Sequence, residues 1–168
     1  MPLSLRPVGM LLAAMLLASA PQAAEPQTTV VFAPAVAQRM ATYGESERAT
    51  LESAIDAALA RAIRRAPLPA GLTLRVTLED LAPSHPTRAQ QLADPSLDPI
   101  RTHYIGGAEL AGEVHDANGR VLTTVSHRYF PLTLQLGSAS RDPWADARLA
   151  IDQFAVRMAA ACRDLPRR

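Results

Sequence analysis

The chain has 168 residues and a mass of 18.0 kDa, the size of one domain. With 48% hydrophobic and 20% charged residues it has the composition of a globular protein, which excludes a wholly disordered chain. All 17 basic residues are arginines and there are 16 acidic residues, so the net charge is close to zero. This balance gives no long-range field for a polyanion, and we expect neither a nucleic acid nor an anionic membrane surface as a partner.

Residues 1–24 have the pattern of an export signal. Arg6 makes the start positive, residues 8–17 form an uncharged apolar run, and small residues follow. The run is too short to span a bilayer, which needs about 20 helical residues. Cleavage after Ala23 or Ala24 removes one arginine and no acid, so 16 of each remain. No cysteine to which a lipid could be attached follows the apolar run, so we expect a soluble product in the periplasm or outside the cell.

The first elements of the expected mature chain are a strand and an ambiguous stretch. Residues 28–32 are β-branched and apolar and predict a strand. Residues 33–41 stay open between helix and loop, because Pro34 interrupts the run.

A long amphipathic helix is predicted over 46–65. Thr42 with Glu45 fits a capping box, and Ser46 is an alternative start. Acidic residues come early and arginines late, as the helix dipole favours, and Pro67 ends the pattern. Apolar residues recur at every fourth position: Leu51, Ile55, Leu59 and Ile63.

An alternating strand over 72–78 is followed by an irregular insert, residues 82–101, which contains four prolines. A short helix over 87–92, opened by Pro86, is expected inside it. Irregular segments of this length are uncommon in compact domains and are often functional. The polar side chains predicted to contact a partner are Ser84, His85, Arg88 and Gln91.

Two further strand patterns, 104–115 and 121–130, predict a hairpin with Asn118-Gly119 as its turn. A three-residue loop with a bulged Gly119 is the alternative. The two-residue turn sets the cross-strand pairs Val114–Thr123, Gly112–Val125, Leu110–His127, Ala108–Tyr129, Glu109–Arg128, Glu113–Thr124 and His115–Leu122.

A second helix is predicted from Asp142-Pro143 to Arg163. Its buried stripe is Trp144, Ala147, Ile151, Phe154, Ala155, Met158 and Cys162. The element order predicts an α+β fold: a two-layer sandwich with a mainly antiparallel sheet of three to four strands and two helices on one face. We expect one such domain over 25–168.

Few side chains point to catalysis. Glu109, Glu113 and His115 share a strand face, but Arg128 opposite them disfavours a metal ion, so we expect neither a metal site nor a cofactor. Ser84 neighbours a histidine but lacks the strand–turn–helix setting of a catalytic serine. Cys162 and His127 are expected on apolar faces, as core residues.

Three short motifs resemble a group of uncharacterised proteobacterial envelope proteins of unknown function. They are Gly106-Gly107-Ala108 at the start of a strand, the Asp116 to Gly119 turn, and Asp142 to Ala145 at the start of a helix. The likeness covers roughly 78–160. Many of these proteins are similar to small lipoproteins, although this chain lacks the lipidated cysteine. The resemblance implies an envelope location and an α+β fold, and it implies no activity.

The function expected from the sequence is a non-catalytic binding or accessory role in the cell envelope. The partner would be another envelope protein, bound through the insert or a sheet edge. One alternative is a small hydrolase-like enzyme whose site lies between the insert and the hairpin and uses His85, Glu113 and His115. The other is a small-ligand binder with a pocket between insert and sheet. The sequence sets no oligomeric state.

Overall fold

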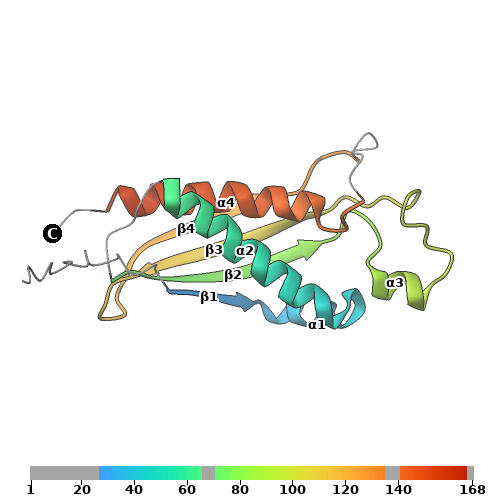
Figure 1. Ribbon diagram of the computed structural model, residues 1–168, viewed down its shortest axis with the longest axis horizontal. Helices are drawn as coiled ribbons and strands as arrows, with labels where there is room; N and C mark the ends of the chain where they lie inside the picture. The colour runs from blue at the N-terminus through green and yellow to red at the C-terminus, as the bar shows by residue number, and fades with distance from the viewer. Residues whose placement is uncertain (1–26, 66–70, 135–140, 166–168) are drawn as a thin grey trace, which may run out of the picture.

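A computed structural model describes residues 27–65, 71–134 and 141–165 (Figure 1). The export signal predicted over 1–24 lies outside these residues. Among the helices in the described ranges, none combines the length and the apolarity that crossing a bilayer requires. In chain order the elements are β1 Gln27–Phe32, α1 Pro34–Tyr43, α2 Glu45–Arg65, β2 Thr73–Ala82, α3 Arg88–Ala93, β3 Gly107–His115, β4 Val121–Tyr129 and α4 Ala145–Arg163.

The strands form one sheet in the order β1-β2-β3-β4. β1 runs parallel to β2, with Val30 opposite Val76, and the other two pairs are antiparallel. Helices α2 and α4 lie side by side on one face of the sheet (Figure 1). The α+β sandwich predicted from the sequence is therefore confirmed. The parallel pair arises because α1 and α2 carry the chain back to the end of the sheet where β1 began.

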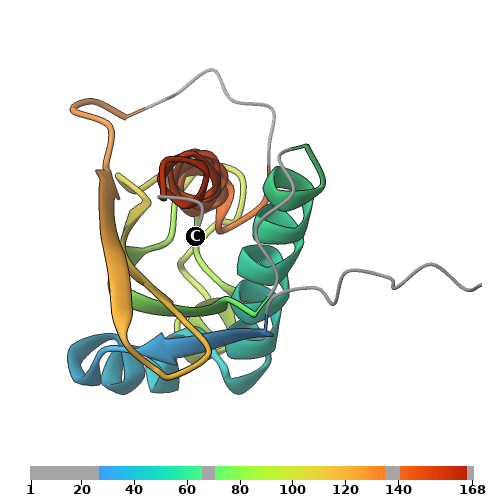
Figure 2. The ribbon, with the colours of Figure 1, turned by 90° about the vertical axis from the view of Figure 1, so that its left-hand side faces the viewer.

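The sheet curls around α4. Seen end-on in Figure 2, β4 stands beside this helix while β1 lies beneath it, and α2 lies at its other side. Gly112 of β3 allows the helix to approach closely. A Cβ there would lie 2.7 Å from Phe154 Cζ and 2.8 Å from Met158 Cε. The fully buried side chains of this interface include Leu74, Leu78, Leu110, Ile151, Phe154 and Met158.

The stretch left open in the sequence is helix α1. Pro34 occupies its first turn, where the missing N–H costs nothing. Its buried residues Val36, Met40 and Tyr43 recur at helical spacing. Thr42 lies inside this helix and donates its hydroxyl to the Arg39 carbonyl at 2.7 Å. The predicted Thr42 cap of the long helix is therefore wrong, and α2 begins at Glu45, directly after Gly44.

The predicted hairpin register is confirmed from Ala108–Tyr129 to Val114–Thr123. Nearer the turn it shifts by one residue, so that His115 lies opposite Val121 and not opposite Leu122 as predicted.

The cause of this shift is the turn itself. Asp116 Oδ1 accepts the N–H groups of Asn118 at 2.9 Å and Arg120 at 3.0 Å. Gly119 has φ 78°, whereas Asn118 does not adopt a positive φ. The two-residue Asn-Gly turn is therefore wrong, and the alternative loop with Gly119 in the left-handed conformation is observed.

The short helix expected in the insert is α3, with a different first residue. Thr87 caps it: the Thr87 N–H donates to Gln90 Oε1 at 2.9 Å and the Gln90 N–H donates to Thr87 Oγ1 at 3.4 Å. Pro86 precedes this cap and does not open the helix.

Candidate functional site

The insert begins with five consecutive buried residues, Pro83 to Thr87, which we call the anchor segment. Only 7% of Ser84 and 5% of His85 is exposed. Two of the four residues predicted to contact a partner are thus covered by the protein itself. Arg88 is exposed, and Gln91 is half-buried with its amide donating to the Pro86 carbonyl at 2.9 Å.

Ser84 fastens the anchor segment to the start of α4. Its N–H donates to the Pro143 carbonyl at 2.6 Å, and its hydroxyl donates to Asp146 Oδ2 at 2.9 Å. The same Oγ accepts the Asp146 N–H at 3.2 Å, which satisfies one of the free amides of the helix N-terminus. The hydroxyl is engaged in a structural junction, and within the described part of the chain no histidine is hydrogen-bonded to it.

Gly106 makes this junction possible. A Cβ there would contact Ser84 Oγ and lie 2.7 Å from Ser84 N. The neighbouring Tyr104 N–H donates to the Ser84 carbonyl at 2.9 Å, so the two ends of the insert meet. The backbone of Gly106 therefore approaches Ser84 more closely than a residue with a Cβ would allow.

Trp144 connects the same helix end to the rest of the fold. Its indole N–H donates to Glu47 Oε2 at 2.6 Å, and its ring meets Tyr43 edge-on with centroids 5.4 Å apart. Burial raises the pKa of Tyr43, an effect that nearby Arg39 partly offsets. The anchor segment is consequently held by a turn that is itself bonded to α2 and packed on α1.

The second half of the insert, residues 92–101, is its exposed arm. Leu92 is 70% and Ile100 55% exposed. In Figure 1, α3 and this arm lie beyond the end of the sheet.

Side-chain hydrogen bonds shape the arm. Asp94 Oδ1 accepts the N–H and the hydroxyl of Ser96 at 3.0 and 2.6 Å. Asp98 Oδ1 accepts the N–H groups of Ile100 and Arg101 at 2.7 and 3.0 Å. These bonds hold the pKa of both carboxyl groups below the usual range. The arm therefore presents its apolar side chains from defined turns.

Glu113 and His115 meet on the face of the sheet opposite the one that α4 covers. His115 Nε2 lies 3.0 Å from Glu113 Oε2, and His115 Nδ1 lies 3.1 Å from the Gly119 carbonyl. On the same face Arg128 Nε lies 3.2 Å from Glu109 Oε2, the cross-strand pair predicted from the sequence.

His85 does not join Glu113 and His115. It follows Ala82, which pairs with the first residue of β3, whereas His115 is the last residue of β3 and pairs with Thr73. Since β3 has nine residues, it separates these ends by roughly 26 Å at about 3.3 Å per residue. The alternative enzyme site that combined His85, Glu113 and His115 is not assembled.

His85 instead contacts His103, with ring centroids 4.6 Å apart. His85 Nδ1 is buried and has no hydrogen-bond partner among the residues that the structure describes. Across the described ranges, no three His, Cys, Asp or Glu side chains gather as metal ligands would. Burial raises the pKa of Cys162 to about 11, so this thiol is a core group and not a nucleophile. His127 is also a core residue, with Nε2 2.9 Å from Gln153 Oε1.

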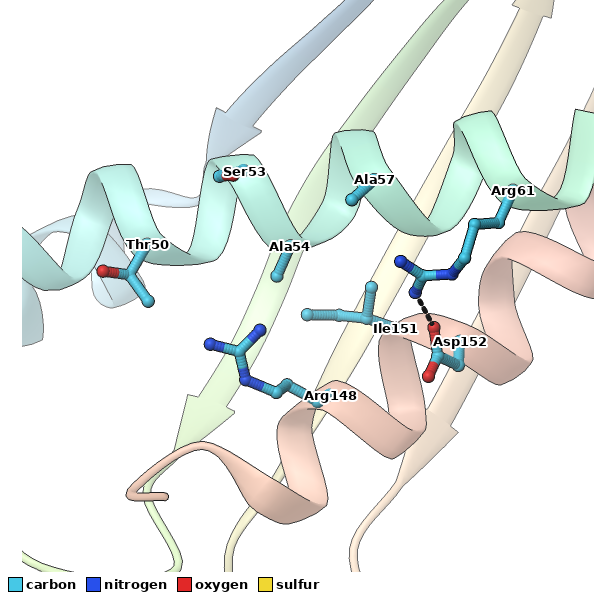
Figure 3. A pocket seen from close by; sticks show the side chains of 8 residues that line it. All are labelled: Thr50, Ser53, Ala54, Ala57, Arg61, Arg148, Ile151 and Asp152. Atoms are coloured by element: carbon cyan, nitrogen blue, oxygen red, sulfur yellow. Dashed lines mark hydrogen bonds and ion pairs between the residues drawn. The ribbon is translucent and has the colours of Figure 1, made fainter.

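A groove runs between α2 and α4 (Figure 3). One hollow of about 380 Å³ and a second of about 410 Å³ share Arg61 and Asp152, so they adjoin. Arg61 donates to Asp152 Oδ1 at 2.7 Å and bridges the two helices at this point (Figure 3). The first hollow is lined by Thr50, Ser53, Ala54, Ala57, Arg61, Arg148, Ile151 and Asp152.

This groove was not predicted from the sequence. A signal for it is present in the sequence of α2, where the alanines at 54, 58 and 62 form a second apolar stripe beside the one formed by the large apolar side chains. Two stripes mean that a helix packs against two neighbours, here the sheet and α4. Neither hollow is lined by the insert, where the small-ligand pocket was expected.

No protein-family model matches the sequence, and neither a curated protein nor a solved structure matches the chain. Two surfaces of the molecule are candidate binding sites. These are the arm, residues 92–101, and the groove between α2 and α4.

Proposed function

We propose that the protein is a non-catalytic binding or accessory protein of the bacterial cell envelope, exported once residues 1–24 are removed. It contacts another envelope protein through the arm, residues 92–101. The observation that carries this proposal is the exposure of Leu92 and Ile100 on an insert whose base is buried. The resemblance of the Gly-Gly-Ala, turn and helix-start motifs to envelope proteins supports the location.

Apolar exposure of this kind favours association. Covering apolar surface gains about 25 cal/mol per Å², and Leu92 and Ile100 offer two large aliphatic side chains. The turns at Asp94 and Asp98 fix the backbone between them. Binding then loses less conformational entropy than it would with an unstructured loop.

The polar groups of the insert favour binding over catalysis. Ser84 is bonded to Asp146, and the Glu113–His115 pair lies at the other end of β3. A hydrolase needs a nucleophile and a base within hydrogen-bond reach of each other, and these residues serve other partners.

Cross-linking in intact native cells tests the proposal. The full chain is compared with the variant Leu92→Asp/Ile100→Asp and with Val121→Asp, a matched control. Val121 is 44% exposed and lies at the turn end of the hairpin, away from the insert. We expect the same envelope protein to be captured by the wild type and by Val121→Asp, and its yield to fall at least about tenfold with the arm variant. Equal yields from all three would refute the role of the arm.

N-terminal sequencing of the protein recovered from the cell envelope tests export separately. The processed chain should begin at Ala24 or Glu25. Protein found only in the cytoplasm with residues 1–24 still attached would contradict the envelope location.

A further inference from the structure

The groove between α2 and α4 concentrates positive charge. Its two hollows are lined by Arg61, Arg65, Arg148 and Arg163 and by one acidic residue, Asp152, a local excess of three positive charges. The whole chain has an excess of one. On α2 the lining extends from Thr50 to Arg65, about 22 Å of helix at 1.5 Å per residue.

Two of these arginines are engaged within the protein and two are not. Arg61 pairs with Asp152 at 2.7 Å, and Arg148 pairs with Asp142 at 2.6 Å. Arg65 and Arg163 form no ion pair or hydrogen bond with any residue in the described part of the chain. Both line the second hollow, so that end of the groove presents two cations available to an anionic partner.

The groove also has an apolar component. Its exposed apolar side chains are Ala57 and Val156, the latter 59% exposed, whereas Ile151, Ala58, Ala62 and Ala159 of the lining are buried. An apolar surface edged by cations matches a partner that is apolar on one side and acidic on its flanks.

We propose that this groove binds an acidic amphipathic helix of a partner protein. A trough between two packed helices accepts a third helix at the usual 8–10 Å spacing. Arg65 and Arg163 lie in the last turns of α2 and α4 and line the same hollow, so they present positive charge from both helices to the carboxylates of the facing helix. The partner's apolar stripe lies against the exposed side chains of Val156 and Ala57. No residue of the arm lines the groove, so this site is distinct from the one in the proposed function.

A peptide titration of the ¹⁵N-labelled full chain tests the inference. The probe is an 18-residue helical peptide with leucines on one side and glutamates one turn apart on the other. A second peptide carries lysine for every glutamate. We expect the acidic peptide to shift amide resonances within 50–65 and 148–163, and the lysine peptide to leave them unchanged.

Charge variants identify the residues responsible. Arg65→Glu/Arg163→Glu should weaken binding of the acidic peptide at least about tenfold at low salt. The neutral pair Arg65→Gln/Arg163→Gln should also weaken it, with less disturbance of the helix ends. Arg157→Glu is the matched control, because Arg157 is exposed on α4 and does not line the groove. It should change the affinity less than about twofold.

Several results would overturn the inference: equal binding of the lysine peptide, equal weakening by Arg157→Glu, or shifts centred on the arm. Binding of phosphatidylglycerol vesicles with no response to the acidic peptide would also overturn it and indicate a lipid surface. Leu92→Asp/Ile100→Asp should leave peptide binding unchanged. Failure of the arm proposal is thereby distinguishable from failure of this one.

Discussion

Replacement of Ser84 by alanine tests the junction that holds the insert. The variant loses the hydrogen bond to Asp146 Oδ2 at 2.9 Å and the one from the Asp146 N–H at 3.2 Å. A hydrogen bond to a charged group contributes about 1.5–3 kcal/mol and a neutral one about 0.5–1.5 kcal/mol. Asp146 is only half-buried, so water compensates part of this loss. We expect the free energy of unfolding to fall by about 2 kcal/mol.

Thermal unfolding followed by circular dichroism measures this change. For a chain of this size, 1 kcal/mol corresponds to about 2–4 °C in Tm, so the expected fall is roughly 4–8 °C. Ser126→Ala is the control, because Ser126 is exposed on β4 and has no hydrogen bond with another described side chain. Its effect should stay within about 0.5 kcal/mol.

A double-mutant cycle with Asp146→Ala isolates the contact itself. Asp146→Ala also removes the acidic residue from the first turn of α4, which costs stability by a separate route. The coupling between the two substitutions should be about 1 kcal/mol or more. A coupling near zero, or a Ser84→Ala variant as stable as the wild type, would show that this junction does not hold the insert.

Three further predictions concern packing, reactivity and pH. Gly112→Ala should lower the free energy of unfolding by about 1–3 kcal/mol in urea denaturation, because the added Cβ would lie 2.7 Å from Phe154 Cζ; an unchanged midpoint would contradict the close approach of α4. Burial raises the pKa of the Cys162 thiol to about 11. At pH 8 it should therefore react with a disulfide reagent at least about a hundred times more slowly in the native protein than in denaturant. Equal rates in the two states would exclude a buried thiol. Folding lowers the pKa values of Asp94 and Asp98, so both carboxylates stabilise the turns of the arm fully when the pH is above their unfolded-state pKa of about 3.9. This stabilisation is lost as the pH falls through their pKa values in the folded protein. As the pH is lowered, NMR should show the Ser96, Ile100 and Arg101 amides losing protection from hydrogen exchange before the amides of the core do. Simultaneous loss would contradict the idea that the two carboxylates stabilise the arm alone.

Elements with strong periodicity were predictable from the sequence. The predicted helix 46–65 differs from α2 by one residue, and every side chain predicted for the buried stripe of the last helix is buried. The predicted start of that helix at Pro143, capped by Asp142, is wrong: α4 begins at Ala145, and the buried Trp144 directly precedes it. The hairpin register was predictable because opposite charges and apolar residues each pair in only one alignment. These signals are local, and neighbouring residues carry them.

The turn and the junction were not predictable from such patterns. At the turn, the Asp116 side chain decides between two loops that the Asn-Gly pair alone leaves open. Ser84 and Asp146 are 62 positions apart, and each has an ordinary local setting, a loop serine and a first-turn acid. Only the packing of α4 on the sheet brings them together. The groove likewise depends on how α2 lies against α4, which neither helix specifies alone.

Helix α4 connects the base of the insert to the second hollow of the groove. Asp146 holds the anchor segment at its first turn, and Arg163 lines the groove at its last. These two residues are 17 positions apart, which at 1.5 Å per residue corresponds to about 25 Å. This distance is well beyond the range over which substitutions usually couple. The effects of Ser84→Ala and Arg163→Gln on the free energy of unfolding should therefore add to within about 0.5 kcal/mol. A larger deviation in the double variant would show that α4 transmits a change from the groove to the insert.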